Sequence, residues 1–394
     1  MQQSLSRPPK SGYLPSLDGW RAIAILGVLI THDLPWVMGG RSTAAYKGYG
    51  GYGVELFFAI SGFLITTRIL EEEKLCGYFD IKRFYIRRVL RIQPAALAYL
   101  SVVALLIAFG VVHDRWLYWF SALFSFRNYA WYSFVVPRNG FFTGHFWTLS
   151  VEEHFYILLS ATLFFFKKRR LLILATLYVL FQVIAHLERV YGTQQFRNTE
   201  VQIHFLLLPA IVALLMQREE VSRLVKFVVR PWLVWLATLV CLTVAIHRSQ
   251  THPWLPALYQ ANFAQRWIYV VSYGFLLFIL STMFHPQSWT TRVLETRVLR
   301  FIGRISYSLY LWHVLFFFRF AGDIGITNHL LLALSGRPTK QIAAFVVATL
   351  SYYLIEKPLV RLGHKLAPAA TPGRPELADL PVETPLNSDA KLTV

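Results

Sequence analysis

The sequence predicts an all-α protein, a polytopic bundle of about ten membrane-spanning helices with both termini in the cytoplasm. Three observations support this class. Hydrophobic residues make up 55% of the 394 residues and charged residues only 15%, whereas an ordinary soluble domain carries about 25% charge. The apolar residues gather into stretches of about 17 to 25 residues, the length of a helix that crosses the hydrocarbon core. Basic residues are distributed unevenly among the loops. A soluble enzyme is therefore excluded.

The apolar stretches define the expected helices. They lie near 17–34, 52–70, 92–112, 148–166, 171–187, 203–216, 232–247, 267–284, 299–319 and 341–357. The aromatic segment 116–126 is either an eleventh span or a re-entrant segment. Residues 1–16 are expected to form a cytoplasmic N-terminal segment, and 17–365 the transmembrane domain. Residues 366–394 hold several prolines and few large hydrophobes, so they are expected to be a disordered cytoplasmic tail.

The distribution of basic residues orients the bundle. With an even number of spans, the loops on the side of the termini hold roughly twice as many Lys and Arg as the other loops. By the positive-inside rule this side is cytoplasmic, and the protein is expected to be a multi-pass protein of the cytoplasmic (inner) membrane. The net charge of +18 therefore does not indicate nucleic-acid binding, because a basic DNA-binding domain would not bury such long apolar runs. The two cysteines cannot form a disulfide framework.

Two ionisable residues in the first predicted helix are candidate functional residues, because charged groups within hydrocarbon cost several kcal/mol. Arg21 and His32 are eleven positions apart, which places them on one helical face about 16 Å apart along the axis. The alternative is that both side chains only reach outward to the lipid headgroups on opposite sides.

Further ionisable residues fall into two predicted levels. The acids and histidine expected near the outer face are His32, Asp33, Glu55, Glu152 and Glu153. The arginines expected near the cytoplasmic face are Arg21, Arg68, Arg87, Arg88, Arg91 and Arg304. Arginine suits bidentate recognition of phosphate, so such a cluster can hold a phosphorylated cytosolic donor. For any single arginine, simple anchoring at the headgroups is the alternative. A histidine oriented by a carboxylate is a candidate general base.

Several motifs are missing from the sequence. It contains no phosphate-binding loop of the Walker type and no zinc-protease motif. His247 and His252 lack a third ligand in view, so no metal site is expected. No serine or cysteine stands in a recognisable nucleophile arrangement.

Six strings of residues resemble signatures of the acyltransferase 3 family of integral-membrane enzymes, which O-acylate sugars and related hydroxyl compounds. The strings are Leu17–Ala24 with His32, Gly53–Ile65, Arg87–Pro94, Trp147–Tyr156, Ile305–His313 and Ile355–Pro358. The chain departs from the family pattern at His154, where glutamine is expected. The resemblance implies His32 as the catalytic base, Arg21 as its signature partner, and functional roles for Arg88 and Arg91.

The resemblance also implies the reaction. An acyl group, by default acetyl, would move from cytoplasmic acyl-CoA to a hydroxyl of a surface or exported carbohydrate or another acceptor. Acyl-CoA is a co-substrate in this reaction, and no bound cofactor is expected. Direct transfer is favoured because no serine or cysteine nucleophile arrangement is recognisable, although an acyl-histidine intermediate stays open. Depth suggests Glu55, Glu152 and Glu153 as further catalytic groups, with Glu55 or Glu152 orienting His32. The lipid bilayer is the other expected partner, and the sequence does not specify an oligomeric state. The alternative is a transporter or flippase of a glycan, lipid or anionic solute, in which charged residues line a solute path.

Overall fold

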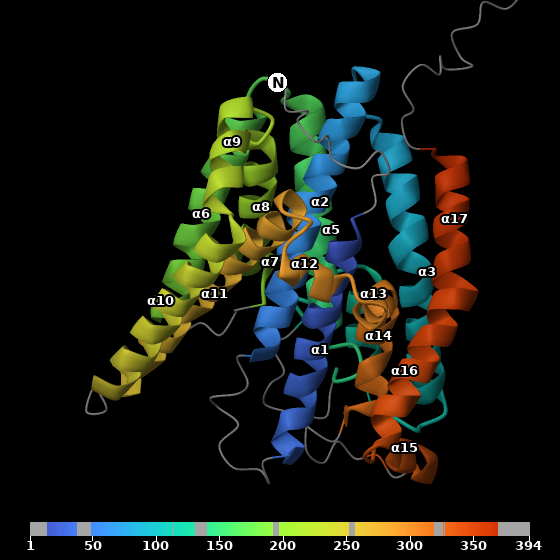
Figure 1. The fold of residues 1–394 in the computed structure, drawn as a ribbon. Coiled ribbons are helices and arrows are strands. Elements are labelled where there is room, and N and C mark those ends of the chain that lie inside the picture. The colour runs from blue at the N-terminus through green and yellow to red at the C-terminus, as the bar shows by residue number, and fades with distance from the viewer. Residues whose placement is uncertain are drawn as a thin grey trace, which may run out of the picture.

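The computed structural model describes residues 14–37, 49–112, 114–130, 140–191, 197–251, 257–318, 326 and 328–368. These residues form helices and no strand (Figure 1), so the predicted all-α class is confirmed. The helices are α1 (Pro15–Val37), α2 (Tyr49–Cys76), α3 (Ile81–Ala108), α4 (Trp116–Leu123), α5 (Phe146–Phe165), α6 (Arg170–Tyr191), α7 (Thr199–Gln202), α8 (His204–Leu215), α9 (Glu219–Val228), α10 (Pro231–Thr251), α11 (Ala257–Phe284), α12 (Trp289–Leu294), α13 (Arg297–Arg304), α14 (Ser306–Phe316), α15 (His329–Leu334), α16 (Thr339–Ser351), the π-helical turn η2 (Tyr352–Glu356) and α17 (Lys357–Leu366).

Among the described residues, four helical segments are long and apolar enough to cross a membrane: Gly51–Cys76, Ile81–Ala108, Arg170–Glu188 and Thr339–Leu366. The pair α9 and α10 would add a fifth if it counts as one span bent by 59°. The chain is therefore an integral membrane protein. The number of about ten spans and the location of the termini remain predictions.

Several predicted spans differ from the observed helices in their bounds, and for two of them the structure shows the reason. Helix α3 begins at Ile81 rather than near 92, because the Asp80 carboxylate caps it by accepting a hydrogen bond from the Arg83 backbone N–H at 2.9 Å. The predicted single helix 299–319 is wrong, since the chain breaks at Ile305 between α13 and α14. Helix α13 carries three arginines in eight residues, a composition that does not belong in hydrocarbon.

Small residues allow close contact between helices. A Cβ atom at Gly53 of α2 would meet the carbonyl oxygen of Ala24 on α1, and one at Gly62 would meet that of Leu206 on α8. A Cβ atom at Gly303 of α13 would overlap the backbone of Asp18 on α1. Helix backbones in membranes approach this closely where a glycine has no side chain to separate them. The close approach stabilises the helix pair through van der Waals packing.

Helix α1 lies near the middle of the bundle. In Figure 1, α6 and α8 to α11 gather on one side of it, and α3, α16 and α17 on the other. It packs against α2 and α13, and also contacts α11, α12 and α14. The buried core around it includes Ile25, Phe58, Tyr99 and Phe155. The central position of α1 brings both of its candidate residues, Arg21 and His32, into the interior of the protein.

Candidate active site

Three histidines from separate elements meet near the C-terminal end of α1. The Nδ1 atom of His32 on α1 lies 2.8 Å from the Nε2 atom of His313 on α14. The ring of His145, the residue before α5, is 5.8 Å from that of His313, centroid to centroid. His313 is fully buried and His145 is 7% exposed. We refer to His32, His145 and His313 as the histidine cluster.

Tyrosine and threonine side chains extend the histidine cluster along α5. The Tyr310 hydroxyl donates to the carbonyl oxygen of His145 at 2.9 Å and lies 2.8 Å from Thr148 Oγ1. Tyr310 and His313 are three residues apart on α14, so they share a face. Thr148 is one helical turn before Glu152 on α5. The polar side of α5 therefore leads from the histidine cluster toward Glu152.

Glu152 binds an arginine rather than a histidine in this structure. Its carboxylate accepts from Ser61 of α2 at 3.1 Å, from Tyr156 of α5 at 2.7 Å and from Arg88 Nη2 of α3 at 3.3 Å. The Arg88 guanidinium also contacts the Tyr156 hydroxyl and lies 3.8 Å from the centre of that ring. Only 10% of the Arg88 side chain is exposed.

The expected separation of acids and arginines by depth is therefore wrong for Glu152. Glu152 lies seven residues after His145 along α5. At a rise of 1.5 Å per residue, it is about 10 Å along the helix axis from the histidine cluster. Arg88 lies a similar distance inside α3, because that helix begins at Ile81. The two side chains consequently meet within the bundle.

Three charged residues extend the Arg88 site toward the surface. Arg21 donates to Asp18 at 3.3 Å, and it lies close enough to Arg91 for the two positive charges to repel. Arg91 is exposed. Glu356, in the π-helical turn η2, accepts a hydrogen bond from Ser308 at 3.0 Å. Its carboxylate also interacts electrostatically with Arg91 and Arg21. We refer to Arg21, Arg88 and Arg91 as the arginine cluster.

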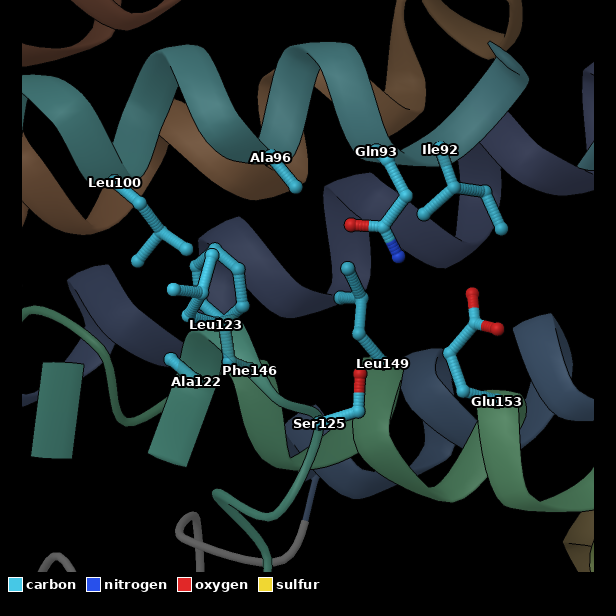
Figure 2. Close-up of a pocket in the computed structure, with 10 residues that line it drawn as sticks. All are labelled: Ile92, Gln93, Ala96, Leu100, Ala122, Leu123, Ser125, Phe146, Leu149 and Glu153. Atoms are coloured by element: carbon cyan, nitrogen blue, oxygen red, sulfur yellow. The ribbon is translucent and has the colours of Figure 1, made fainter. Parts of the chain in front are cut away.

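The other two predicted catalytic acids, Glu55 and Glu153, make different contacts. Glu55 on α2 is 8% exposed and accepts a hydrogen bond from Ser272 of α11. Glu153 lines a small pocket between α3, α4 and α5, whose walls are otherwise mostly apolar (Figure 2). Gln93 and Ser125 are the other polar side chains of that pocket. Glu153 thus lines a pocket that Glu152 does not line, although both carboxylates interact electrostatically with Arg88.

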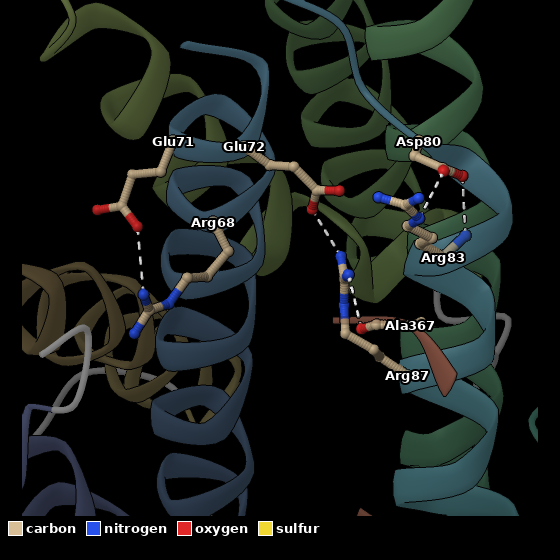
Figure 3. Close-up of polar contacts among 7 residues, drawn as sticks. All are labelled: Arg68, Glu71, Glu72, Asp80, Arg83, Arg87 and Ala367. Carbon is tan, nitrogen blue, oxygen red and sulfur yellow. Dashed lines mark hydrogen bonds and ion pairs between the residues drawn. The ribbon is translucent and has the colours of Figure 1, made fainter. Parts of the chain in front are cut away.

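Two further predicted arginines make ion pairs near the C-terminal end of α2 (Figure 3). Arg68 pairs with Glu71 at 3.2 Å, and Arg87 pairs with Glu72 at 2.6 Å. Arg87 also donates to the carbonyl oxygen of Ala367, just after α17. These contacts join α2, α3 and the end of α17, so they account for Arg87 as a structural residue.

Sequence reasoning missed several residues of the site. His313 and Tyr310 lie within one of the six strings, but the strings alone assign them no role. Arg197, just before α7, lies near His32 and 5.7 Å from the centre of the Trp147 ring. Burial lowers the pKa of Arg197 to about 9, so it stays protonated at neutral pH and its charge acts on the histidine cluster. For Tyr310 and His313, the sequence did offer one indication. Their spacing of three residues places both polar side chains on the same face of a predicted helix.

Arg127, also missed, holds the connection between α4 and α5. Its guanidinium donates to the carbonyl oxygens of Ala130 and Gly140, and its Nε donates to Thr143. A Cβ atom at Gly140, whose φ is 79°, would collide with Arg127. Burial lowers the pKa of Arg127 to about 10, and nearby Asp114 opposes this shift. These bonds fix the backbone that leads into His145.

No group of three or more potential metal ligands with suitable geometry is found among the described residues. His247 and His252 fall outside the described side chains, so the expectation about them stays a prediction.

The fold and this site define a helical membrane protein that contains an arginine cluster and a histidine cluster. Residues 14–357 match the family model described as an acyltransferase domain of the acyltransferase 3 type. The chain belongs to the acyltransferase 3 family.

Two curated proteins of Staphylococcus aureus illustrate the relationship. The O-acetyltransferase OatA of strain NCTC 8325 is 28% identical over 382 residues, covering 90% of this chain and 58% of OatA. A protein of strain COL, named as a candidate O-acetyltransferase, is 30% identical over 337 residues, covering 77% of this chain and 50% of that protein. The chain thus spans about half the length of the curated relatives it matches. No solved structure matches it.

Proposed function

We propose that the protein is a multi-pass enzyme of the cytoplasmic membrane that transfers an acyl group, by default acetyl, from cytoplasmic acyl-CoA to a hydroxyl of a surface or exported carbohydrate. The proposal is supported by membership of the acyltransferase 3 family and by relatives named O-acetyltransferases. The observation that carries it is the position of polar residues on α5 between the two clusters: Glu152 binds Arg88, and Thr148, one turn away, lies beside Tyr310 and His145.

The arginine cluster is the proposed binding site for the donor. Acyl-CoA carries phosphates at one end and the reactive thioester at the other, so a positive mouth and a remote base suit its elongated shape. Arg91 is exposed and able to meet phosphate first. Arg88 is held by Glu152 and Tyr156 in a fixed orientation, and a fixed guanidinium binds phosphate with less loss of conformational freedom.

The histidine cluster is the proposed reaction centre. His32 takes the proton of the acceptor hydroxyl while that oxygen forms a bond to the thioester carbonyl carbon. The carbon–sulfur bond then breaks, and the proton passes from His32 to the departing CoA sulfur. The cation of Arg197 supplies positive charge near the oxyanion that develops in this step. In this proposal Glu152 acts by orienting Arg88, and Glu55 and Glu153 remain candidate catalytic residues.

The test follows free thiol released from acetyl-CoA by purified protein in nanodiscs, in the presence of a panel of carbohydrate acceptors. We expect thiol release by the wild type and a loss of about 100-fold or more in His32→Ala, at unchanged protein level and unchanged CoA binding. Thiol release by His32→Ala at the wild-type rate would remove His32 from the mechanism. A wild type that neither binds CoA nor consumes thioester would favour the transporter alternative.

A further inference from the structure

The contact between His32 and His313 is a hydrogen bond in the plane of both rings. The two rings are parallel within 10° and their centroids are 4.9 Å apart. The joined nitrogens are only 2.8 Å apart, which is closer than two stacked ring planes can approach. The rings therefore meet edge to edge, where the N–H bond and the lone pair of an imidazole point.

A backbone contact fixes which nitrogen of His313 holds its proton. His313 Nδ1 lies 2.7 Å from the carbonyl oxygen of Tyr310. A carbonyl only accepts hydrogen bonds, so His313 carries a proton on Nδ1. Because His313 is fully buried and a buried charge is costly, the neutral ring is favoured and its Nε2 holds a lone pair. The proton between the two histidines then belongs to His32 Nδ1.

We propose that His313 is a positioning residue that fixes His32 with its lone pair on Nε2, the atom that takes the proton of the acceptor hydroxyl. This inference rests on the proposed function and assigns the reacting atom within it. When His32 Nε2 gains the proton, His313 accepts the hydrogen bond from His32 Nδ1 and stabilises the resulting imidazolium. A carboxylate has that task in the serine protease triad, whereas here it falls to a neutral imidazole anchored to the backbone of its own helix.

Other charged and titratable groups surround the pair. His145 faces His313 from the start of α5, and Arg197 faces His32 from the segment before α7. Asp33, the neighbour of His32 on α1, is bound by Arg337 and Lys340 from the α15–α16 region. Asp33 is therefore committed to an ion-pair cluster, and the orienting contact of His32 comes from α14.

Two variants of His313 separate positioning from packing. His313→Gln keeps an amide oxygen able to accept from His32 Nδ1, whereas His313→Phe keeps the ring shape without an acceptor. We expect kcat of His313→Phe to fall by about 100-fold or more and that of His313→Gln to stay within about tenfold of wild type, with KM for acetyl-CoA unchanged in both. His186→Phe, at an exposed position on α6, is the matched control and should behave as wild type.

Equal losses in His313→Gln and His313→Phe would overturn the proposal, as would wild-type kcat in both. A wild type without thioester consumption would instead overturn the proposed function. Nitrogen-15 magic-angle-spinning NMR of histidine-labelled protein then tests the positioning independently of activity. The histidine signal lost in His32→Ala should show a protonated Nδ1 and an unprotonated Nε2. A proton on Nε2 of neutral His32 would overturn the proposal.

Discussion

At the scale of single residues, the Arg88–Glu152 pair combines a structural contact with a proposed role in donor binding. Glu152→Gln leaves the buried Arg88 guanidinium without its charged partner, so we expect a loss of about 1–3 kcal/mol in the free energy of unfolding. The double variant Arg88→Met with Glu152→Gln removes both charges and should recover part of that loss. Thermal unfolding in detergent measures both effects.

The same double variant tests the proposed role in donor binding. We expect it to bind CoA at least about tenfold more weakly than the wild type, a difference of about 1.4 kcal/mol, although its stability has partly returned. Wild-type CoA affinity in a folded double variant would mean that the pair serves only the fold.

The residue patterns predicted part of this site for physical reasons. Helical spacing places Arg21 and His32 on one face of α1, and the costs of intramembrane charge single them out. The same reasoning could not find the partner of His32, because His313 is 281 positions away and hydropathy carries no information about distance between helices. The same reasoning also placed Glu152 near the outer face. The apolar pattern does not show that α3 begins at Ile81 and so brings Arg88 into contact with Glu152.

At the scale of helices, the close approach of α2 and α8 depends on Gly62. A Cβ atom there would overlap the carbonyl oxygen of Leu206, so we expect Gly62→Ala to destabilise the protein by about 1–3 kcal/mol. The matched control is Gly274→Ala on α11, where a Cβ atom meets nothing within 4 Å. That change should leave stability unchanged or slightly raised, because alanine favours helix. Thermal unfolding curves that move equally for both variants would contradict the packing argument.

Helix positions were largely predictable because hydrocarbon requires long apolar stretches, and every predicted span coincides with one or more helices. The break at Ile305 was not predictable from hydropathy. Helix α13 ends next to Gly303, which lies against the backbone of Asp18. This is a contact between distant parts of the chain, so a local hydropathy pattern does not reveal it. The π-helical turn η2, which positions Glu356 near the arginine cluster, is likewise invisible to an apolar pattern.

At the scale of the whole molecule, the predicted orientation can be tested with the native cysteines. Cys76 is exposed at the end of α2, and Cys241 on α10 is partly exposed. In a Cys241→Ser background, we expect a membrane-impermeant maleimide to label Cys76 only after the cell membrane is opened. A cytoplasmic position follows from the positive-inside rule. Labelling of Cys76 in intact cells would reverse the orientation and place the arginine cluster outside.

The tight seating of α1 has a consequence for donor selection. Glycine contacts with α2, α12 and α13 hold its backbone directly against theirs, so Arg21 and His32 stay a constant ~16 Å apart along one rigid rod. In the proposed reaction, this fixed separation would set the distance between the phosphates of the donor and the site of acyl transfer. In donors with longer acyl chains, the thioester carbonyl would lie at the same position beside His32. The extra carbons would extend past His32, so the space beyond the histidine cluster would determine which acyl chains are accepted.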